Sequence, residues 1–296
     1  MTAPHLTLLT SADWHDYELL DSGDLKKLER FGDFRFIRPE PQAMWQPRLG
    51  ADAWTADGIF RPDKNESENN ESGGWHLSKN LPDSWQIRYQ KLRFLARPTP
   101  FRHLGFFPEQ AAHWNWCAEK MQQFQQRHNR RPRILNLFAY SGLASLHAAA
   151  AGAEVTHVDA SKKAIAQAFE NRDICGFQDA PIRFIADDAR GFVAREIRRQ
   201  RAYDGIIMDP PKYGRGPKGE TWRIEKDLHP LLWQAANLLS DEALFLVLTI
   251  YAIRASSLAA HYALADALKD RPGSIETGEL AIEESAVFGL GTRRYV

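Results

Sequence analysis

The segment Ile134–Asp159, ILNLFAYSGLASLHAAAAGAEVTHVD, carries the pattern that decides the fold of this chain. It begins with a short apolar run, passes through a turn into a stretch rich in helix formers, and ends in a second apolar run. Gly152 stands between the helical stretch and the second run, where glycine commonly ends a helix. The segment therefore predicts one βαβ unit.

The first turn of this unit, at 138–142, would let backbone approach a ligand, and Asp159 at the end of the second strand could bind a ribose. A unit of this kind can bind a dinucleotide. However, Gly142 is the only glycine of the turn, so the G-x-G-x-x-G pattern is missing, and Tyr140 and Ser141 would obstruct a pyrophosphate. The turn therefore favours a nucleoside-type cofactor over NAD.

Strands and helices alternate along the rest of the chain. We expect strands at 181–185, 203–208 and 243–249, and helices at 162–175, 191–201, 224–239 (kinked or restarted at Pro230) and 256–269. Residues 274–282 and 292–296 could form a closing antiparallel pair. This alternation predicts an α/β fold with a Rossmann-like, mostly parallel, seven-stranded sheet.

Asp209-Pro210-Pro211-Lys212 directly follows the buried strand at 203–208. Two prolines cannot extend a central strand, so the Asp209 carboxylate should lie at the carboxyl edge of the sheet, where ligands bind in open α/β folds. It could hold a substrate amine or hydroxyl. It could equally cap the element that follows. The residues upstream favour the first interpretation.

These motifs, in this order, resemble those of class I S-adenosylmethionine-dependent methyltransferases. More narrowly, they are similar to the 23S ribosomal RNA methyltransferase family, with its cytosine-C5 and guanine-N7 relatives. The resemblance rests on the N-L-F-A-Y-S-G turn, the V-D-A-S strand end, the D-D pair and the D-P-P-K-Y loop, and it runs from about Phe101 to the C-terminus. It implies S-adenosyl-L-methionine as cofactor, and RNA (ribosomal RNA or a ribosomal particle) as substrate.

The resemblance also implies roles for individual residues. Asp159 would bind the ribose hydroxyls, Asp188 the adenine amino group, and Asp209 would lie beside the methyl-bearing sulfonium, while Asp187 would be solvated or a cap. Around Gln110 the family's closing segment is altered, since Pro and Glu replace its usual residues and no Arg follows. The residues assigned to the cofactor are Gln110, Phe138, Tyr140, Ser141, Gly142, Asp159, Ala160, Asp187, Asp188, Ala189 and Asp209; those assigned to catalysis are Asp209, Pro210, Lys212 and Tyr213.

The acceptor atom is limited by chemistry. Cytosine C5 needs a cysteine nucleophile, which the family's C5 members carry just after strand five. Here 248–254 reads LTIYAIR without cysteine, and Cys117 and Cys175 are expected to be packing residues, so we favour a base nitrogen. Tyr213 could stack on a flipped base or be a packed loop aromatic. The basic loop at 214–219 could clamp phosphates or be a solvated loop.

Composition agrees with a soluble cytoplasmic enzyme. The 296 residues suggest a small β-rich N-terminal region at 1–100, with a mobile loop at 62–74, and a methyltransferase domain at 101–296. We expect no signal peptide, no membrane span and no metal site. The tryptophans of the N-terminal region could pack it or stack on bases, and packing is favoured; they are Trp45, Trp54, Trp75 and Trp85.

The charge balance leaves other functions open. The chain has 38 basic and 38 acidic residues, which does not support a uniformly basic nucleic-acid binder. A methyltransferase acting on a small molecule or a protein is therefore the main alternative. A NAD-dependent oxidoreductase is disfavoured by the single-glycine turn and by the Asp-Pro-Pro loop.

Overall fold

The computed structural model describes residues 6–11, 14–63, 73–251, 255–285 and 294–295. The predicted mobile loop at 62–74 falls largely outside these ranges. The chain divides into two compact units. Residues 1–7 and 113–279 form the first, here called the sheet unit, and residues 8–112 and 280–296 form the second, here called the aromatic unit. The expected division into an N-terminal region at 1–100 and a methyltransferase domain at 101–296 stays a prediction.

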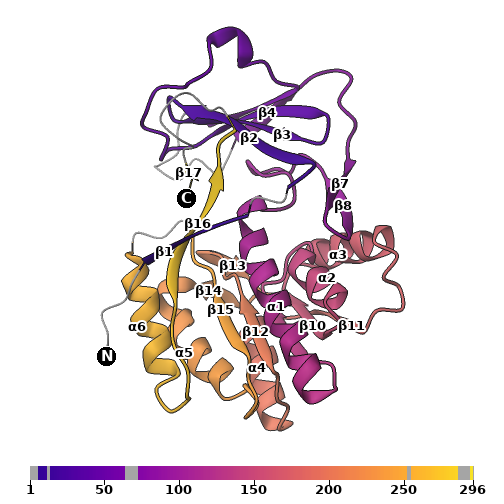
Figure 1. The fold of residues 1–296 in the computed structure, drawn as a ribbon, viewed down its shortest axis with the longest axis vertical. Helices are drawn as coiled ribbons and strands as arrows, with labels where there is room; N and C mark the ends of the chain where they lie inside the picture. Colours follow the sequence, from indigo (N-terminus) through magenta and orange to yellow (C-terminus); the bar gives the residue numbers. More distant parts are fainter. Residues whose placement is uncertain (1–5, 12–13, 64–72, 252–254, 286–293, 296) are drawn as a thin grey trace. The chain divides into compact units, whose positions relative to one another are not determined.

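A parallel five-stranded sheet organises the sheet unit, in the spatial order β11-β10-β9-β12-β15 (Figure 1). Its strands are β9 (Arg133–Leu137), β10 (Glu154–Asp159), β11 (Ile182–Ala186), β12 (Gly205–Met208) and β15 (Phe245–Leu248). The helices around it are α1 (Ala111–His128), α2 (Leu143–Ala150), α3 (Lys162–Ile174), α4 (Ala189–Arg198), α5 (Ile224–Ala236) and α6 (Ser257–Ala267). The predicted α/β fold with a Rossmann-like parallel sheet is thus confirmed.

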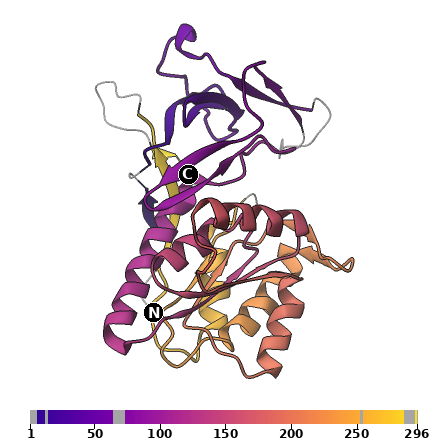
Figure 2. The ribbon, with the colours of Figure 1, turned by 90° about the vertical axis from the view of Figure 1, so that its right-hand side faces the viewer.

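Helices lie on both sides of the parallel sheet (Figure 2), and alternate residues of each strand face one side or the other. Leu135 and Leu137 pack in one cluster with residues of α4, α5 and α6. Ile134 packs in a second cluster with residues of α1 and α2. Both faces of the sheet are therefore covered, which is why its strands read as nearly continuous apolar runs.

The last two strands differ from the expected sheet. β16 (Thr277–Glu283) and β17 (Arg294–Tyr295) pair antiparallel, as predicted, but they form a separate three-stranded sheet with β1 (Leu6–Thr10). In the described residues the parallel sheet thus has five strands rather than seven. The physical reason is that β16 continues past Glu279 to Ile282, which packs with Leu19 in the aromatic unit.

The helix predictions differ at two places. α5 is continuous through Pro230 rather than kinked or restarted there, and it ends at Ala236 instead of 239. Burial of Leu228, Leu231 and Leu232 offsets the missing hydrogen-bond donor of Pro230. In addition, α4 begins at Ala189 and its N-cap is Asp188, whose side chain accepts from the Gly191 amide.

The aromatic unit is rich in strands, as predicted for the N-terminal region. One sheet has the order β2-β3-β4-β5-β6 and a second pairs β7 with β8. These strands are β2 (Tyr17–Gly23), β3 (Lys26–Phe31), β4 (Phe34–Pro39), β5 (Gly58–Pro62), β6 (Gly73–Leu77), β7 (Trp85–Tyr89) and β8 (Leu92–Ala96), with short helices η1 (Ala51–Ala53) and η2 (Pro108–Gln110).

The four tryptophans of this region pack within the aromatic unit. Each indole donates a hydrogen bond inside it: Trp45 to Ser22, Trp54 to Asp21, Trp75 to the Thr99 carbonyl and Trp85 to the Phe31 carbonyl. Trp75 and Trp85 also contact the buried Phe36 ring. The favoured prediction, that these residues pack rather than stack on bases, is consistent with this arrangement.

Candidate functional site

Three neighbouring strands of the sheet unit end at the same level. Val158 lies opposite Leu137, and Leu137 lies opposite Met208, so the next residues are Asp159, Phe138 and Asp209. The two aspartates are thus two strand spacings apart, about 10 Å. Asp187 continues the row on one side, since it follows Ala186, the partner of Asp159. The acids that the sequence placed at strand ends therefore lie along one edge.

Asp159 is held by two backbone amides. Its Oδ2 accepts from the Tyr140 amide and its Oδ1 from the Ser161 amide, both at 2.8 Å. Burial raises the pKa of this carboxyl, and the two amide hydrogen bonds oppose that shift. The side chain is therefore fixed against the turn at 138–142, and further lone pairs remain to accept from a ligand hydroxyl.

The turn at 138–142 adopts an unusual backbone. Phe138 and Tyr140 have φ angles of 56° and 46°, which side-chain-bearing residues rarely adopt, and Gly142 has a φ of 88°. A Cβ at Gly142 would lie 2.9 Å from the Cβ of Ala168 in α3, so α3 approaches the turn closely there. Strain of this kind persists only where surrounding contacts impose it, and it is concentrated at functional sites.

A chain of buried polar side chains lies beneath the turn. Asn136 donates to the Ser145 Oγ at 2.9 Å, which lies 3.0 Å from Nδ1 of His157. In α3, Asn171 donates to the Ser141 carbonyl at 2.9 Å. These contacts connect β9, α2, β10 and α3 to the turn, and they explain how its strained backbone is maintained. Sequence reasoning missed these supporting residues, because a lone Asn, Ser or His in an apolar run carries no local signal.

Asp187 is paired with an arginine, and Asp188 is the cap of the next helix. Asp187 was expected to be solvated or a cap, but its Oδ1 accepts from the Asp188 amide and its Oδ2 pairs with Arg195. The helix cap is instead Asp188, because it directly precedes Ala189 and its Oδ2 reaches the Gly191 amide at 3.0 Å. Its contact with an adenine amino group stays a prediction.

Asp209-Pro-Pro-Lys leads into a hairpin that sequence reasoning did not foresee. β13 (Tyr213–Arg215) pairs antiparallel with β14 (Thr221–Arg223). Trp222 is buried, packs against Phe138 at a ring distance of 4.9 Å, and donates to the Pro211 carbonyl at 2.6 Å. The predicted basic loop at 214–219 thus includes the last two residues of β13 and most of the turn of this hairpin. The sequence did carry a signal for these two strands, because small or apolar residues (Gly214 and Trp222) alternate with larger polar ones on either side: Tyr213, Arg215, Thr221 and Arg223.

Pro210 is buried, whereas Lys212 and Tyr213 are exposed, Tyr213 to 50%. Tyr213 is therefore not a packed loop aromatic. Gln110 is the last residue of η2, in the aromatic unit. The remaining cofactor candidates, Ala160 and Ala189, directly follow Asp159 and Asp188 in the chain.

The edge fits an adenosine-type cofactor. A fixed carboxylate at Asp159 suits a ribose diol, and the turn offers backbone without the open glycine loop that a pyrophosphate needs. No group of His, Cys, Asp and Glu that could hold a metal occurs among the described residues. Over those same parts of the chain, no helix has the length and apolar character required to cross a membrane.

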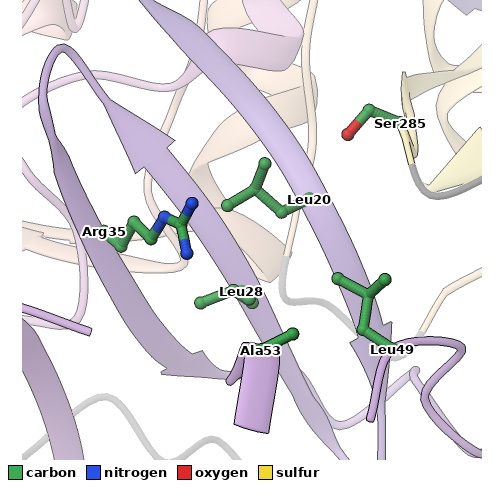
Figure 3. A pocket seen from close by; sticks show the side chains of 6 residues that line it. All are labelled: Leu20, Leu28, Arg35, Leu49, Ala53 and Ser285. Atoms are coloured by element: carbon green, nitrogen blue, oxygen red, sulfur yellow. The ribbon is translucent and has the colours of Figure 1, made fainter. Parts of the chain in front are cut away.

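The aromatic unit contains a cavity of about 240 Å³ (Figure 3). Its lining is mostly aliphatic, and none of the residues predicted for the cofactor or for catalysis contributes to it: Leu20, Leu28, Arg35, Leu49, Ala53 and Ser285. The cavity therefore does not change the assignment of the candidate site to the strand ends of the sheet unit.

Comparison with known proteins agrees with this geometry. Residues 110–244 match the family model described as conserved hypothetical protein 95. A crystal structure titled as the SAM-dependent methyltransferase from Agrobacterium tumefaciens is 43% identical, with a TM-score of 0.91 over 99% of this chain and 92% of that one. A putative SAM-dependent methyltransferase from Streptococcus mutans, 16% identical, shares the fold over 93% of this chain and 70% of its own, with a TM-score of 0.67.

Curated relatives match over a shorter stretch. The ribosomal RNA large subunit methyltransferase K/L of Shewanella baltica is 38% identical over 110 residues, which is 36% of this chain and 15% of that protein. The protein of the same name from Magnetococcus marinus is 30% identical over 159 residues, 53% of this chain and 20% of its own length. This chain therefore corresponds to a small part of these relatives.

Proposed function

This chain belongs to the S-adenosylmethionine-dependent methyltransferases, and we propose that it methylates a base nitrogen of RNA, with ribosomal RNA as the favoured substrate. The proposal rests on one observation about the edge of the parallel sheet. Asp159 follows β10 and Asp209 follows β12, two strands away, and the exposed Tyr213 comes four residues after Asp209. Such an edge can hold a nucleoside cofactor at one strand and an acceptor base at the other.

S-adenosylmethionine supplies an electrophilic methyl group on a sulfonium centre. In the proposed reaction Asp159 binds the ribose hydroxyls, while the turn at 138–142 orients the cofactor. Asp209 accepts a hydrogen bond from the acceptor nitrogen, aligns its lone pair for in-line attack and takes its proton. Pro210 holds the carboxylate at the end of β12, since proline fixes φ.

RNA is favoured by the exposed aromatic and by the relatives. Tyr213 lies next to the Asp-Pro-Pro-Lys loop, where its ring can stack on a base that has left its helix, and the Lys212 ammonium can contact an adjacent phosphate. The curated relatives are ribosomal RNA methyltransferases by name. An RNA substrate of this kind would also place the protein in the cytoplasm.

A base nitrogen is favoured over cytosine C5 because neither cysteine suits a nucleophile. Cys117 is buried in α1, where burial raises the pKa of its thiol, and Cys175 caps the end of α3. The stretch after β15 has no cysteine in its sequence. A small-molecule or protein acceptor is the second candidate, supported by the formal net charge of zero.

The test is transfer of tritiated methyl groups from S-adenosylmethionine to RNA extracted from cells that lack the gene, with wild-type RNA as control. We expect label to enter only the RNA of the deletion strain, and digestion to nucleosides then identifies the methylated atom. Absence of label from both naked RNA and ribosomal particles, with cofactor binding intact, would contradict an RNA acceptor and favour the second candidate.

A further inference from the structure

The hairpin β13–β14 has one buried and one exposed face. Tyr213 lies opposite Arg223, Gly214 opposite Trp222, and Arg215 opposite Thr221. Because cross-strand partners share a face and neighbours along a strand alternate, Tyr213, Arg215, Thr221 and Arg223 lie on the face away from Trp222. Trp222 is 3% exposed and Tyr213 is 50% exposed, so this second face points to solvent. It is called here the hairpin face.

Several bonds hold the hairpin in place. The Trp222 indole donates to the Pro211 carbonyl at 2.6 Å, and the Ile224 amide donates to the Lys212 carbonyl at 3.0 Å. From α4, Arg190 donates to the Thr221 carbonyl at 3.0 Å. In Figure 2 the hairpin (orange) projects from the rest of the sheet unit. The hairpin face is thus a fixed surface that begins at the Asp-Pro-Pro-Lys loop.

The segment that carries this face is basic, although the chain as a whole has no net charge. Five basic residues occur within 212–226, and all of them are exposed: Lys212, Arg215, Lys218, Arg223 and Lys226. The acids of the same segment are Glu220 and Glu225. Glu220 accepts from the Lys218 amide inside the turn. The exposed side chains of this segment therefore include more basic than acidic groups, and two of the basic residues are neighbours of Tyr213 on the hairpin.

Two arginines are neighbours of the Tyr213 ring on the hairpin face. Arg223 lies directly across from Tyr213, and Arg215 donates from Nε to the Tyr213 hydroxyl at 3.2 Å. An aromatic ring bordered by cations on two sides is the arrangement that binds an unpaired nucleotide, since the base stacks and the adjacent phosphates are neutralised. In a duplex the base faces are already stacked, so double-stranded RNA would gain no contact with the ring.

We propose that the hairpin face binds single-stranded RNA at the target nucleotide, with the base on Tyr213 and the flanking phosphates on Arg215 and Arg223. This inference rests on the proposed RNA methylation and specifies the substrate as an unpaired segment. It assigns specificity-determining roles to Arg215, which belongs to the basic loop at 214–219, and to Arg223, which none of the sequence motifs includes.

The test compares the double variant Arg215→Ala/Arg223→Ala with the wild-type protein. We expect KM for RNA from the deletion strain to rise about tenfold at physiological salt, with kcat at saturating RNA and S-adenosylmethionine affinity within about twofold. For a single-stranded oligouridylate of about 12 nucleotides, the slope of log affinity against log salt should fall by about 1.4, since each phosphate contact on a single strand contributes about 0.7.

Two control proteins sharpen this experiment. Arg131→Ala removes an exposed arginine just before the amino end of β9, at the opposite edge of the sheet, and should leave KM and the salt slope unchanged. The variant Arg215→Lys/Arg223→Lys keeps both charges and should restore most of the salt slope.

Three results would overturn the proposal. A wild-type KM and salt slope in the double alanine variant, while the wild-type protein methylates RNA, would refute the hairpin face and leave the proposed function intact. Equal competition by duplex RNA of the same length would refute single-strand binding. Failure of the wild-type protein to methylate or bind any RNA would refute both the function and this inference.

Discussion

Two carboxyl groups serve different purposes at the two edges of the sheet. Asp204, at the amino end of β12, accepts from both terminal nitrogens of Arg130, from the Arg133 amide and from the Ser240 hydroxyl. These donors lower its pKa to about 2 and use its acceptor capacity. Asp159, at the carboxyl end of β10, has two amide donors and a raised pKa. Asp204 is thus structural, whereas Asp159 can still bind a ligand.

We expect Asp159→Ala to weaken S-adenosylmethionine binding by about 1–3 kcal/mol, roughly 5-fold to 150-fold, because the charge-assisted hydrogen bonds to the ribose are lost. Isothermal calorimetry measures this directly. Glu154→Ala is the matched control, since Glu154 is exposed at the opposite end of the same strand. Unchanged affinity of the Asp159 variant would remove this residue from the cofactor site.

Asp209→Asn should lower kcat far more than cofactor affinity, since Asn keeps the shape of the side chain but cannot take a proton. We expect kcat to fall by about 100-fold or more, with the Kd for S-adenosylmethionine within about threefold. Single-turnover methyl transfer and calorimetry on the same preparation separate the two quantities. Near-normal transfer would mean that the Asp-Pro-Pro loop only ends the strand.

His157 makes the stability of the sheet unit depend on pH. Burial lowers its pKa from 6.5 to about 3, because a charged imidazolium is poorly solvated in that interior. Above pH 6.5 the ring is neutral in both folded and unfolded chains. As the pH falls below 6.5 the unfolded chain binds a proton that the folded one does not, so stability falls progressively toward pH 3.

The variant His157→Gln should therefore lose less stability than wild type between pH 7 and pH 5. The difference should be about 2 kcal/mol, although the variant is less stable at pH 7 because it alters the buried Asn136–Ser145–His157 chain. Urea unfolding followed by the helical circular dichroism signal measures it, since α2 to α6 belong to the sheet unit. Equal losses of stability between pH 7 and pH 5 in the variant and in the wild type would contradict the lowered pKa of His157.

At the scale of elements, the position of α3 against the turn at 138–142 decides whether the cofactor site is formed. Gly142→Ala places a Cβ 2.9 Å from the Ala168 Cβ and also requires a left-handed backbone, whereas Gly176→Ala requires only the left-handed backbone. Each substitution should lower the free energy of unfolding by about 1–2 kcal/mol through backbone strain. Gly142→Ala should lower it further because of its contact with Ala168.

Urea unfolding and S-adenosylmethionine titration of the two glycine variants distinguish these effects. We expect Gly142→Ala to lose cofactor affinity at least tenfold, since the turn must shift away from α3, and Gly176→Ala to bind as wild type does. Equal stability and equal affinity in the two variants would show that the close approach of α3 is not needed.

Most of the elements of the sheet unit could be predicted because their signals are local. Apolar runs give the five strands, Ser161 and Ser256 mark helix starts by accepting amide hydrogen bonds, and Gly152 follows a helix end. The alternation around Trp222 indicates the two short strands of the hairpin but not where the hairpin packs, because the contact of Trp222 with Phe138 joins residues 84 apart in sequence. The choice between Asp187 and Asp188 as cap is also tertiary, since Arg195 engages the first of them.

At the scale of the whole molecule, the aromatic unit is assembled from both ends of the chain. Its second segment begins at Leu280, and Ser22 donates to the buried Glu284 at 2.8 Å. Ile282 packs against the cluster of Leu19 and Ala43. The sequence could not predict this assembly from two separate segments, because strand patterns do not show which distant strand will pair.

Ile282→Ala should therefore destabilise the N-terminal strands rather than the helices next to it in sequence. We expect a loss of about 2–4 kcal/mol in the aromatic unit, from the removed side-chain volume against Leu19. Hydrogen exchange measured by mass spectrometry should show faster exchange in β2 and β3, with β9 and β10 unchanged. Glu279→Ala, an exposed position on the same strand, is the control. Faster exchange in α6 with β2 unchanged would show that the C-terminal segment stabilises its sequence neighbours instead.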